Sequence, residues 1–499
     1  MKFIGRVDYL DKLSALWRKD RSSFAVVSGR RRIGKSTLVE EFARRSSCDF
    51  IEIVGLPPDR TMTNQRQIDN FCERLAKATG KPEAKADCWP KAFDALVAAI
   101  GPRRKTIVFL DEISWMGRYD DAFAGFLKTA WDTQLSLRDN LILVVAGSVS
   151  AWIHKNIQRS KAYVGRISLD ISLPELPLSE CREFWGRKVD RTATREMLDV
   201  MSVTGGVPKY LSEIDPSLSA DENIRRLCFD PNGYLFNDFE RIFDDVFDES
   251  VAAKKRIVVA LADGPASIQE LAERIRVPSS GHISTDVCDL VEAGFVAGVR
   301  GKNPDTGRDV REVRYRLKDN YTRFYLKYIL PKADAIREGI FRYVSLDMLP
   351  GWDAIMGLQF ENLVLNNFQT LARHIGLVGK NVESVAPYFR RGRTSGDGVQ
   401  IDMLVQLPKC VYLVEVKRMN RIPASVEQEV QRKIDRLPLK KGKSVKTVLV
   451  YDGELAPELE EDGFFDRLVR MDELMGSSCG GGVRVAVPYE IGGVRPECR

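Results

Sequence analysis

Eight consecutive residues of this sequence have the spacing of a phosphate-binding loop. Gly29-Arg-Arg-Arg-Ile-Gly-Lys-Ser36 fits the pattern GxxxxGK[ST] without a mismatch, and an apolar run at 24–28 precedes it. In such a loop the glycines let backbone N–H groups surround a β-phosphate, the lysine reaches the β- and γ-phosphates, and the serine hydroxyl holds Mg²⁺. A helix expected at 37–45 adds the positive end of its dipole. We therefore expect ATP and Mg²⁺ to bind at Gly29, Arg32, Ile33, Gly34, Lys35, Ser36 and Thr37.

A second apolar run, at 106–110, ends in the acids Asp111 and Glu112. A P-loop enzyme keeps a magnesium ligand and a residue that orients the attacking water at such a strand end. We expect Asp111 to hold Mg²⁺ through a water molecule and Glu112 to polarise the nucleophile. The alternative is that both acids are solvated loop charges, which the phosphate loop upstream disfavours.

Three charged residues near the C-terminal end suit a site for a divalent metal. Asp402 lies in an apolar run at 399–405, and Glu415 and Lys417 lie in another at 411–417. The two-residue period of a strand places Glu415 and Lys417 on one face. Two carboxylates hold Mg²⁺, and a lysine positions the hydrolytic water or stabilises charge on the phosphorane.

A fourth charge, Glu361, lies in a helix expected at 358–372. Its helical position falls inside the apolar stripe of Leu358, Leu365 and Phe368. A carboxylate on a buried face costs free energy unless it has a partner, which makes Glu361 a further candidate for this group of charges. Gln428 and Gln431, on a helix near 424–437, are further polar candidates. The alternative is a satisfied ion-pair cluster with no catalytic role.

Several motifs together resemble the archaeal-type ATPases of the AAA+/STAND branch. They are Phe3-Ile4-Gly5-Arg6, the phosphate loop, Leu110-Asp111-Glu112, Ala146-Gly147-Ser148 and Thr204-Gly205-Gly206-Val207-Pro208-Lys209-Tyr210. The resemblance implies that residues 3–6, including Gly5 and Arg6, lie near the adenine. It also implies that Ser148 is a sensor-like residue beside the γ-phosphate, and that Gly206 and Pro208 belong to a lid over the nucleotide.

The same resemblance makes Val164-Gly165-Arg166 a candidate arginine-finger element, with Arg166 catalytic. Arg159 is an available alternative, and a plain surface arginine is another. An arginine supplied by a neighbouring copy would complete the γ-phosphate site. We therefore expect that the protein is able to form a homo-oligomer when ATP is bound.

Residues 251–318 have the pattern of a winged helix-turn-helix, again similar to the same ATPase family. Three helices are expected, at 255–262, 267–275 and 283–293, followed by a hairpin of 295–300 and 312–317. The third helix carries Asp286, Asp289 and Glu292 and no Lys or Arg, so it does not support base-specific reading of DNA. The wing at 300–318 has seven Lys/Arg and three acids, a net charge of +4. Duplex binding through the wing and packing against protein both remain open.

The C-terminal charges resemble those of the PD-(D/E)xK nuclease superfamily. The resemblance implies that Glu361 is the helical acid, that Asp402 and Glu415 are metal ligands, and that Lys417 is the catalytic lysine. Gln428 would be a helical partner. One departure is that no Pro-Asp pair precedes the second strand, because Val399-Gln-Ile stands before Asp402.

These residues require an α/β fold in several domains. The chain has 499 residues, which suggests about three domains. Apolar runs that alternate with helical patterns predict a parallel sheet in the first part. We expect a P-loop ATPase core with a parallel sheet at 1–174, a helical lid at 175–248, a winged helix-turn-helix at 249–320, a helical linker at 321–350, a small nuclease-like α/β domain at 351–475 and a tail at 476–499.

Composition narrows the partners and the compartment. The net charge is +6, which permits a nucleic-acid partner without requiring one. Nine Cys without a CxxC pair give neither a disulfide framework nor a zinc ribbon, and three His make a His-based metal site unexpected. No apolar run is long enough to span a bilayer. We expect a protein of the reducing cytoplasm, with no membrane partner.

Two functional hypotheses follow. In the first, the chain hydrolyses ATP and acts on DNA, and its C-terminal domain cleaves nucleic acid with Mg²⁺. In the second, it is a nucleotide-dependent switch or scaffold whose C-terminal domain binds partners without cleavage. Convergence of Glu361, Asp402 and Glu415 favours the first hypothesis.

Overall fold

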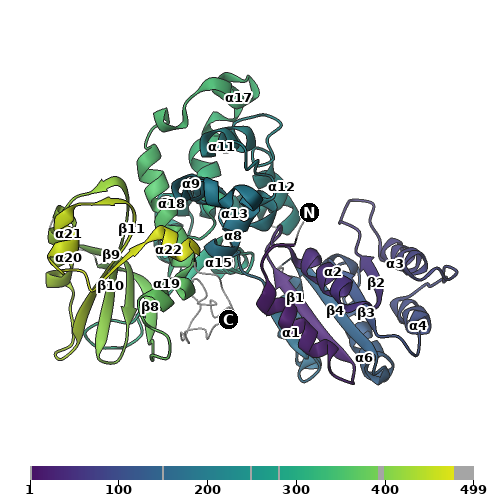
Figure 1. Cartoon of the computed structure of the whole chain (residues 1–499). Helices are drawn as coiled ribbons and strands as arrows, with labels where there is room; N and C mark the ends of the chain where they lie inside the picture. Colours follow the sequence, from purple (N-terminus) through teal and green to yellow (C-terminus); the bar gives the residue numbers. More distant parts are fainter. Residues whose placement is uncertain (1–2, 149–150, 248–249, 279–280, 391–397, 477–499) are drawn as a thin grey trace. The chain divides into compact units, whose positions relative to one another are not determined.

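The computed structural model describes residues 3–148, 151–247, 250–278, 281–390 and 398–476. The chain divides into two compact units, one up to Glu175 and one from Leu176 onward. Each unit has its own five-stranded sheet (Figure 1). The expected tail lies, after Gly476, outside the described residues.

The first unit is a parallel α/β sheet with the strand order β2-β3-β4-β1-β5, and every neighbouring pair is parallel. The strands are β1 (Ser23–Gly29), β2 (Asp49–Val54), β3 (Thr106–Asp111), β4 (Leu141–Ser148) and β5 (Leu169–Ser172). The helices are α1 (Val7–Trp17), α2 (Lys35–Ser46), α3 (Asn64–Thr79), α4 (Trp89–Ala99), α5 (Ile113–Met116), α6 (Phe123–Thr133) and α7 (Ala151–Ile153). The expected parallel sheet is therefore confirmed.

Helices cover both faces of this sheet (Figure 1). Alternate residues of β1 explain why: Phe24 and Val26 pack into a core with α3, α4 and α6, whereas Ala25 and Val27 pack into a second core with α1 and α2. A strand buried on both faces reads as a continuous apolar run. Each large apolar side chain buried there contributes about 2 kcal/mol.

The second unit begins with helices and a small hairpin. The helices are α8 (Leu178–Cys181), α9 (Thr194–Thr204), α10 (Pro208–Leu211), α11 (Ala220–Cys228), α12 (Asp238–Val246), α13 (Val251–Ala262), α14 (Ile268–Ile275), α15 (Gly281–Glu292), α16 (Asn320–Phe324) and α17 (Ala333–Arg337). The strands β6 (Val296–Val299) and β7 (Arg314–Leu317) pair antiparallel, over fewer residues than expected. Ser267 and Glu270 form a capping box at the start of α14.

The remainder of the second unit is a mixed sheet with the order β12-β11-β10-β9-β8. Its strands are β8 (Ser384–Arg390), β9 (Val399–Gln406), β10 (Cys410–Ile422), β11 (Ser444–Leu455) and β12 (Arg467–Arg470), and its helices are α18 (Trp352–Asn366), α19 (Phe368–His374), α20 (Ser425–Arg436), α21 (Pro457–Glu461) and α22 (Met471–Gly476). The first three strands run antiparallel, and β11 and β12 continue parallel to β10.

The expected helix at 358–372 is wrong in its bounds. The chain forms α18 and α19, which are separated at Asn367 with φ −109° and ψ 23°. The side chain of Asn367 donates to the carbonyl of Leu363 at 2.8 Å and accepts from the backbone N–H of Leu178 at 3.0 Å. Such side-chain bonds to backbone compete with a continuous helix. Leu358 is 43% exposed, so it does not belong to the buried stripe that was expected around Glu361.

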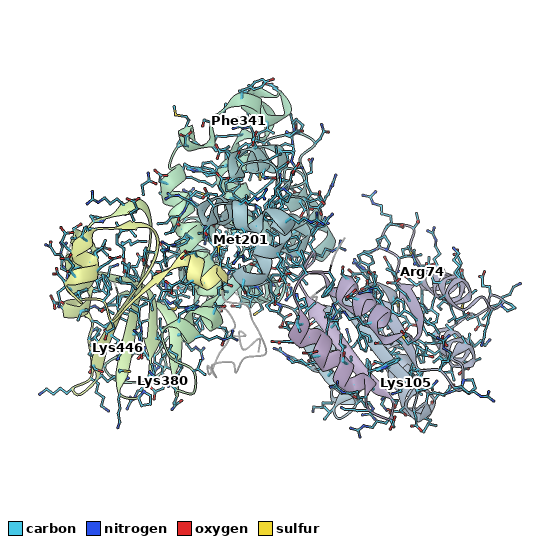
Figure 2. All side chains as sticks on the ribbon, viewed as in Figure 1. Arg74, Lys105, Met201, Phe341, Lys380 and Lys446 are labelled. Carbon is cyan, nitrogen blue, oxygen red and sulfur yellow. The ribbon has the colours of Figure 1, made fainter. Side chains whose placement is uncertain are left out.

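The helices expected to form a lid divide between two hydrophobic cores. Trp185 and Met197 pack with Val414 of the mixed sheet, and Met201 lies in the same core within the second unit (Figure 2). The later helices α11 and α12 contribute to a core shared with the hairpin and the segment that follows it. Hydrophobic burial therefore joins the earlier of these helices to the C-terminal sheet and the later ones to the hairpin.

Candidate nucleotide and metal sites

The phosphate loop connects β1 to α2 with a backbone that glycine makes possible. Gly29 has φ 153° and Gly34 has φ 88°. A Cβ at Gly29 would come within 3.0 Å of the carbonyl oxygen of Leu173, so a larger residue cannot be placed there without a shift. Arg32 also has a positive φ, 68°. The loop therefore has the open, curved backbone that exposes N–H groups to an anion.

Lys35 is held inside this loop. Its Nζ donates to the carbonyls of Gly29 at 3.1 Å and Arg30 at 3.2 Å. Burial lowers the pKa of Lys35, and the nearby carboxylates Glu112 and Asp111 oppose that effect. The ammonium of Lys35 is thus already positioned at the loop. A bound phosphate would favour its charged form, which burial disfavours.

The acids at the end of β3 meet the start of α2. Ser36 Oγ donates to Asp111 Oδ2 at 2.6 Å, and Asp111 Oδ1 accepts from the backbone N–H of Glu112 at 2.9 Å. Glu112 has φ 48°, a conformation that costs a non-glycine residue about 1 kcal/mol or more. A hydroxyl and a carboxylate are the hard oxygen ligands that Mg²⁺ prefers, so these residues fit the expected ion.

The N-terminal segment lies against the phosphate loop. Arg6 Nη2 donates to the carbonyl of Pro174 at 2.6 Å and to that of Ile33 at 3.3 Å. Gly5 and Arg6 both adopt positive φ, Ile33 is fully buried, and Thr37 is exposed in the first turn of α2. Contact of this segment with adenine remains a prediction.

Arg166 has an internal partner. Its Nε and Nη2 donate to the two carboxylate oxygens of Asp132 at 2.6 and 2.8 Å, and these bonds lower the pKa of Asp132 to about 2. A role as an arginine finger is untested. Ser148 ends β4, but its side chain lies outside the described residues. Pro208 begins α10 in the second unit, and its role in a lid stays a prediction.

The predicted C-terminal residues converge. Asp402 on β9 and Glu415 on the adjacent β10 line one cavity of about 370 Å³ with Glu361 and Lys417. Asp402 Oδ2 accepts from the backbone N–H of Val416 at 2.8 Å. Lys417 Nζ lies 2.9 Å from Glu415 Oε1, which confirms that these two residues share one face of the strand.

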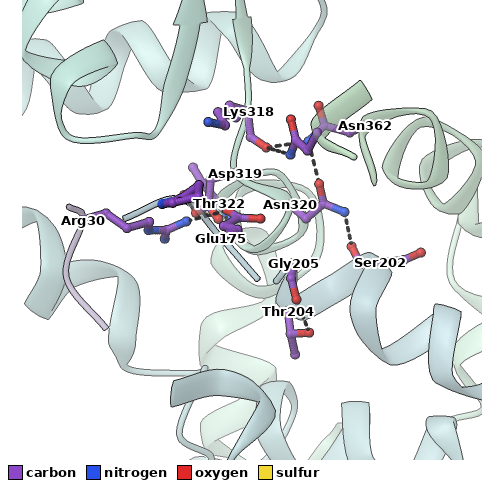
Figure 3. Close-up of polar contacts among 12 residues, drawn as sticks. Arg30, Glu175, Ser202, Thr204, Gly205, Lys318, Asp319, Asn320, Thr322 and Asn362 are labelled. Atoms are coloured by element: carbon purple, nitrogen blue, oxygen red, sulfur yellow. Dashed lines mark hydrogen bonds and ion pairs between the residues drawn. The ribbon is translucent and has the colours of Figure 1, made fainter. Parts of the chain in front are cut away.

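A buried polar joint positions the helix that carries Glu361. Asn362 Nδ2 donates to Asn320 Oδ1 at 2.5 Å, and Asn320 Nδ2 donates to the carbonyl of Ser202 at 3.1 Å (Figure 3). Arg323 Nη1 donates to Gln359 Oε1 at 2.9 Å. These bonds tie α18 to α16 and to the end of α9, and so fix the helix that carries Glu361.

Two residues of α20 that were not predicted also enter the cavity. Lys433 Nζ lies 2.7 Å from both carboxylate oxygens of Glu415, and Glu429 contacts Lys433 at 3.0 Å and Lys417 at 3.0 Å. The predicted partners on this helix are wrong: Gln428 and Gln431 are exposed. They lie away from the cavity because Val426 and Val430 set the buried face of the helix.

Burial dominates the electrostatics of this cluster. Burial raises the pKa of Glu361 to about 6, and Glu415 adds to the effect. Burial, Glu415 and Glu361 raise the pKa of Asp402 well above its ordinary range. For Lys433, burial alone would lower the pKa, but Glu415 reverses the direction and raises it.

The cluster offers carboxylate oxygens, the ligands that suit Mg²⁺. Within the described residues, however, no group of three or more His, Cys, Asp or Glu side chains is arranged to hold a metal ion. Lys433 supplies the positive charge next to Glu415 instead. The donor set fits a divalent ion, whereas the positions of the side chains are those of an ion-pair cluster.

Ion pairs and hydrogen bonds within the second unit engage many of the charged residues of the segment 251–318. Lys254 of α13 is buried and pairs with Asp286 at 2.7 Å and Asp289 at 3.0 Å, which accounts for two acids on α15. Much of the positive charge of the wing is also engaged: Lys302 pairs with Asp309, Arg314 pairs with Glu270, and Arg316 bonds to Asn362 and Asn366. The exposed cations of the wing include Arg308 and Arg311, so its net charge of +4 overstates what it can offer to DNA.

In the part of the chain that the structure describes, no helix has both the length and the apolar character needed to cross a bilayer.

Comparison with known proteins supports an ATPase domain in the first part of the chain. Residues 3–214 match a family model described as an ATPase domain predominantly from Archaea. The uncharacterized protein MJECL04 of Methanocaldococcus jannaschii is 22% identical over 423 residues, which are 83% of this chain and 87% of that protein. The phosphate loop, Asp111 and the parallel sheet agree with this match. The match supports a P-loop ATPase domain in this part of the chain, and with it nucleotide-hydrolysing activity.

The solved structures that resemble this chain have a lower sequence identity to it than MJECL04 has. The Walker-type ATPase PABY2304 of Pyrococcus abyssi is 16% identical with a TM-score of 0.43, over 65% of this chain and 96% of that one. The ORC2 protein of Aeropyrum pernix, solved as ADPNP-ADP complexes, is 13% identical with a TM-score of 0.42, over 68% and 96%. The ORC1 protein of the same organism, solved in complex with DNA, is 14% identical with a TM-score of 0.33, over 69% and 95%.

Proposed function

We propose that this chain is a cytoplasmic ATPase that acts on DNA and carries a Mg²⁺-dependent, nuclease-like site in its C-terminal domain. The observation that carries the proposal is the convergence of Glu361, Asp402, Glu415 and Lys417 in one cavity. Four charged groups in one partly enclosed space cost free energy. Such a cost in free energy is expected at a functional site that must neutralise a phosphodiester and hold a cation.

In the ATPase half, each residue has a defined role. Lys35 neutralises the β- and γ-phosphates, and the N–H groups of the loop bind the same oxygens. Ser36 and Asp111 would hold Mg²⁺, which supplies charge neutralisation at those phosphates when bound. Glu112 orients a water molecule whose oxygen attacks the γ-phosphorus, while the bond to the β,γ-bridging oxygen breaks. The strained backbone of Glu112 is consistent with a residue held for chemistry.

In the C-terminal half, Lys417 would orient a water and stabilise the negative charge that develops on the phosphorane. The water oxygen bonds to phosphorus as one P–O ester bond breaks, and the leaving oxygen takes a proton. Glu361, Asp402 and Glu415 would hold a divalent ion, which supplies Lewis-acid activation when bound. The antiparallel β8–β9–β10 followed by a helix and a parallel strand supports the resemblance to the PD-(D/E)xK superfamily.

The domain plan and the DNA partner belong to the same proposal. We assign 249–320 as a winged helix-turn-helix, because three helices precede the antiparallel hairpin β6–β7. Arg308 and Arg311 are exposed on its wing and suit phosphate contacts without base reading. The acids of α15 argue against base recognition by that helix.

A second candidate function has an observation of its own. Lys417 and Lys433 both pair with Glu415, so the charge of this carboxylate is compensated without a metal. A satisfied cluster of this kind suits a nucleotide-dependent switch or scaffold whose C-terminal domain binds a partner without cleavage.

Cleavage assays on the full chain separate the two candidates. We expect Asp402→Ala and Lys417→Ala each to abolish Mg²⁺-dependent cleavage of DNA or RNA and to leave ATP hydrolysis within about twofold of wild type, since the two sites share no residue. Gln428→Ala, an exposed change on the neighbouring helix, is the matched control. A wild-type protein that cleaves no nucleic acid with Mg²⁺ or Mn²⁺, and whose melting temperature neither metal alters, would exclude the nuclease and favour the switch.

The proposed association is tested separately. Light scattering with a non-hydrolysable ATP analogue should show a larger species than the nucleotide-free chain, if an arginine of one copy completes the site of another. A strict monomer at every concentration would leave Arg159 or Arg166 to act within one chain, or exclude an arginine finger.

A further inference from the structure

The ammonium of Lys433 contacts both oxygens of the most buried carboxylate of the C-terminal cavity. Its Nζ lies 2.7 Å from both Oε1 and Oε2 of Glu415, and Glu415 is 1% exposed. A cation centred on both oxygens of a carboxylate takes the position of a bidentate metal. The two nearby acids also feel this charge, because Lys433 acts on both Asp402 and Glu361. One ammonium therefore serves all three proposed metal ligands.

Lys417 differs from Lys433 in both geometry and origin. It lies on β10, on the same strand as Glu415, and its Nζ is 2.9 Å from Oε1 of that carboxylate. Lys433 reaches the cavity from α20 at the end of a long, flexible side chain. Withdrawing Lys433 would open Oε2 of Glu415 to a metal ion, while Lys417 stays at Oε1.

Glu429 gives the ammonium of Lys433 a second partner at the mouth of the cavity. The two residues are one helical turn apart on α20, 3.0 Å separates their charged atoms, and the Glu429 side chain is 43% exposed. A lysine that leaves Glu415 could keep this partner and gain water. The movement then involves one side chain and needs no change in the backbone.

We infer that Lys433 is a built-in counter-ion that occupies the position of a divalent cation at Glu415, and that metal entry requires its ammonium to leave. An ammonium centred on both oxygens of Glu415 and a divalent ion bound to the same carboxylate would overlap and repel each other. The inference rests on the proposed metal site and adds its regulation: Lys433 stays bound to Glu415 until a divalent cation displaces it.

The first test measures the accessibility of Lys433 in the full wild-type chain. Amine-reactive labelling with mass spectrometry, in a titration with Mn²⁺ alone, should show Lys433 becoming several-fold more reactive as the metal binds. Lys440, which is exposed, should react equally at every concentration. Asp402→Asn should remove the response, since it removes a proposed ligand.

The second test measures affinity. By calorimetry, Lys433→Met should bind Mn²⁺ at least about tenfold more tightly than wild type, because a competing charge a few ångströms from the metal is gone. Lys440→Met, which removes the same charge outside the cavity, should bind as wild type does. If Lys433→Met does not fold, the labelling of the wild-type chain decides alone.

The outcomes distinguish this inference from the proposed function. Mn²⁺ binding with unchanged labelling of Lys433, or with equal affinity in Lys433→Met, overturns the counter-ion role and leaves the metal site intact. No binding to either wild type or Lys433→Met overturns the metal site, and the counter-ion role with it. Binding only to Lys433→Met supports the inference most strongly.

Discussion

Replacing Glu361 by glutamine should stabilise the protein at neutral pH, because burial raises the pKa of this carboxyl from 4.5 to about 6. The difference of about 1.5 between these values corresponds to about 2 kcal/mol. The folded chain binds this proton more tightly than the unfolded chain does. The favourable contribution is therefore fully present below pH 4.5, and it is lost as the pH rises through 6. Above that pH the buried carboxylate destabilises the fold, and a neutral glutamine does not.

Urea unfolding of the full chain in EDTA, between pH 4.5 and 7.5, checks this expectation. At pH 7.5 Glu361→Gln should gain up to about 2 kcal/mol in the free energy of unfolding of the second unit, and the gain should shrink toward zero at pH 4.5. Glu338→Gln is the matched control, since Glu338 is exposed and the charge change is the same. A loss of stability in Glu361→Gln at pH 7.5, or an equal gain in the control, would refute the reasoning and make Glu361 a satisfied ion-pair partner.

Three further predictions concern the other charged groups. Lys35→Ala should abolish binding of a fluorescent ATP analogue, whereas Glu112→Gln should bind it and lose phosphate release. Arg166→Ala should lower the stability of the first unit, because it removes the partner that lowers the pKa of Asp132. The pKa of Asp132 is lowered to about 2, so wild type should keep this stabilisation at neutral pH and lose it as the pH falls from 3.8 toward 2. Slowed ATP hydrolysis in Arg166→Ala but not in Asp132→Asn would identify Arg166 as an arginine finger. Lys254→Met should destabilise the fold by about 3 kcal/mol in thermal unfolding, because it leaves a buried pair of acids without a cation.

The candidate nucleotide site was predictable because its residues are close in sequence, and because the motif requires a strand before the loop and a helix after it. A strand, a glycine-bearing loop and a helix follow one another from Ser23–Gly29 to Lys35–Ser46, and the continuous apolar run marks a parallel strand. The fifth strand, Leu169–Ser172, was not predicted. It has four residues, of which only Ile171 is buried, so it has no apolar run to reveal it.

The C-terminal site was predictable in its strands and less so in its helices. Asp402 and Glu415 were found because each interrupts an apolar strand. Glu361 was found by a helical stripe that proved partly wrong, since Leu358 is exposed and the helix ends before Asn367. Tertiary contacts of Asn367 with Leu178, almost two hundred residues away in sequence, decide that boundary, and no local pattern contains them.

Lys433 and Glu429 were missed although the sequence holds a signal for them. A Glu and a Lys four residues apart are typical of a solvated helix surface. Read in that way, Glu429 and Lys433 are not recognised as residues of the cavity. Yet Val426, Glu429, Val430 and Lys433 stand at the i, i+3, i+4 and i+7 positions of one helix face, and both valines are buried. Gln428, two residues after Val426, must then project from another face, as it does. The argument that assigned Glu361 to a site, a charge inside an apolar stripe, therefore applies with more force to α20 than to the helix where it was used.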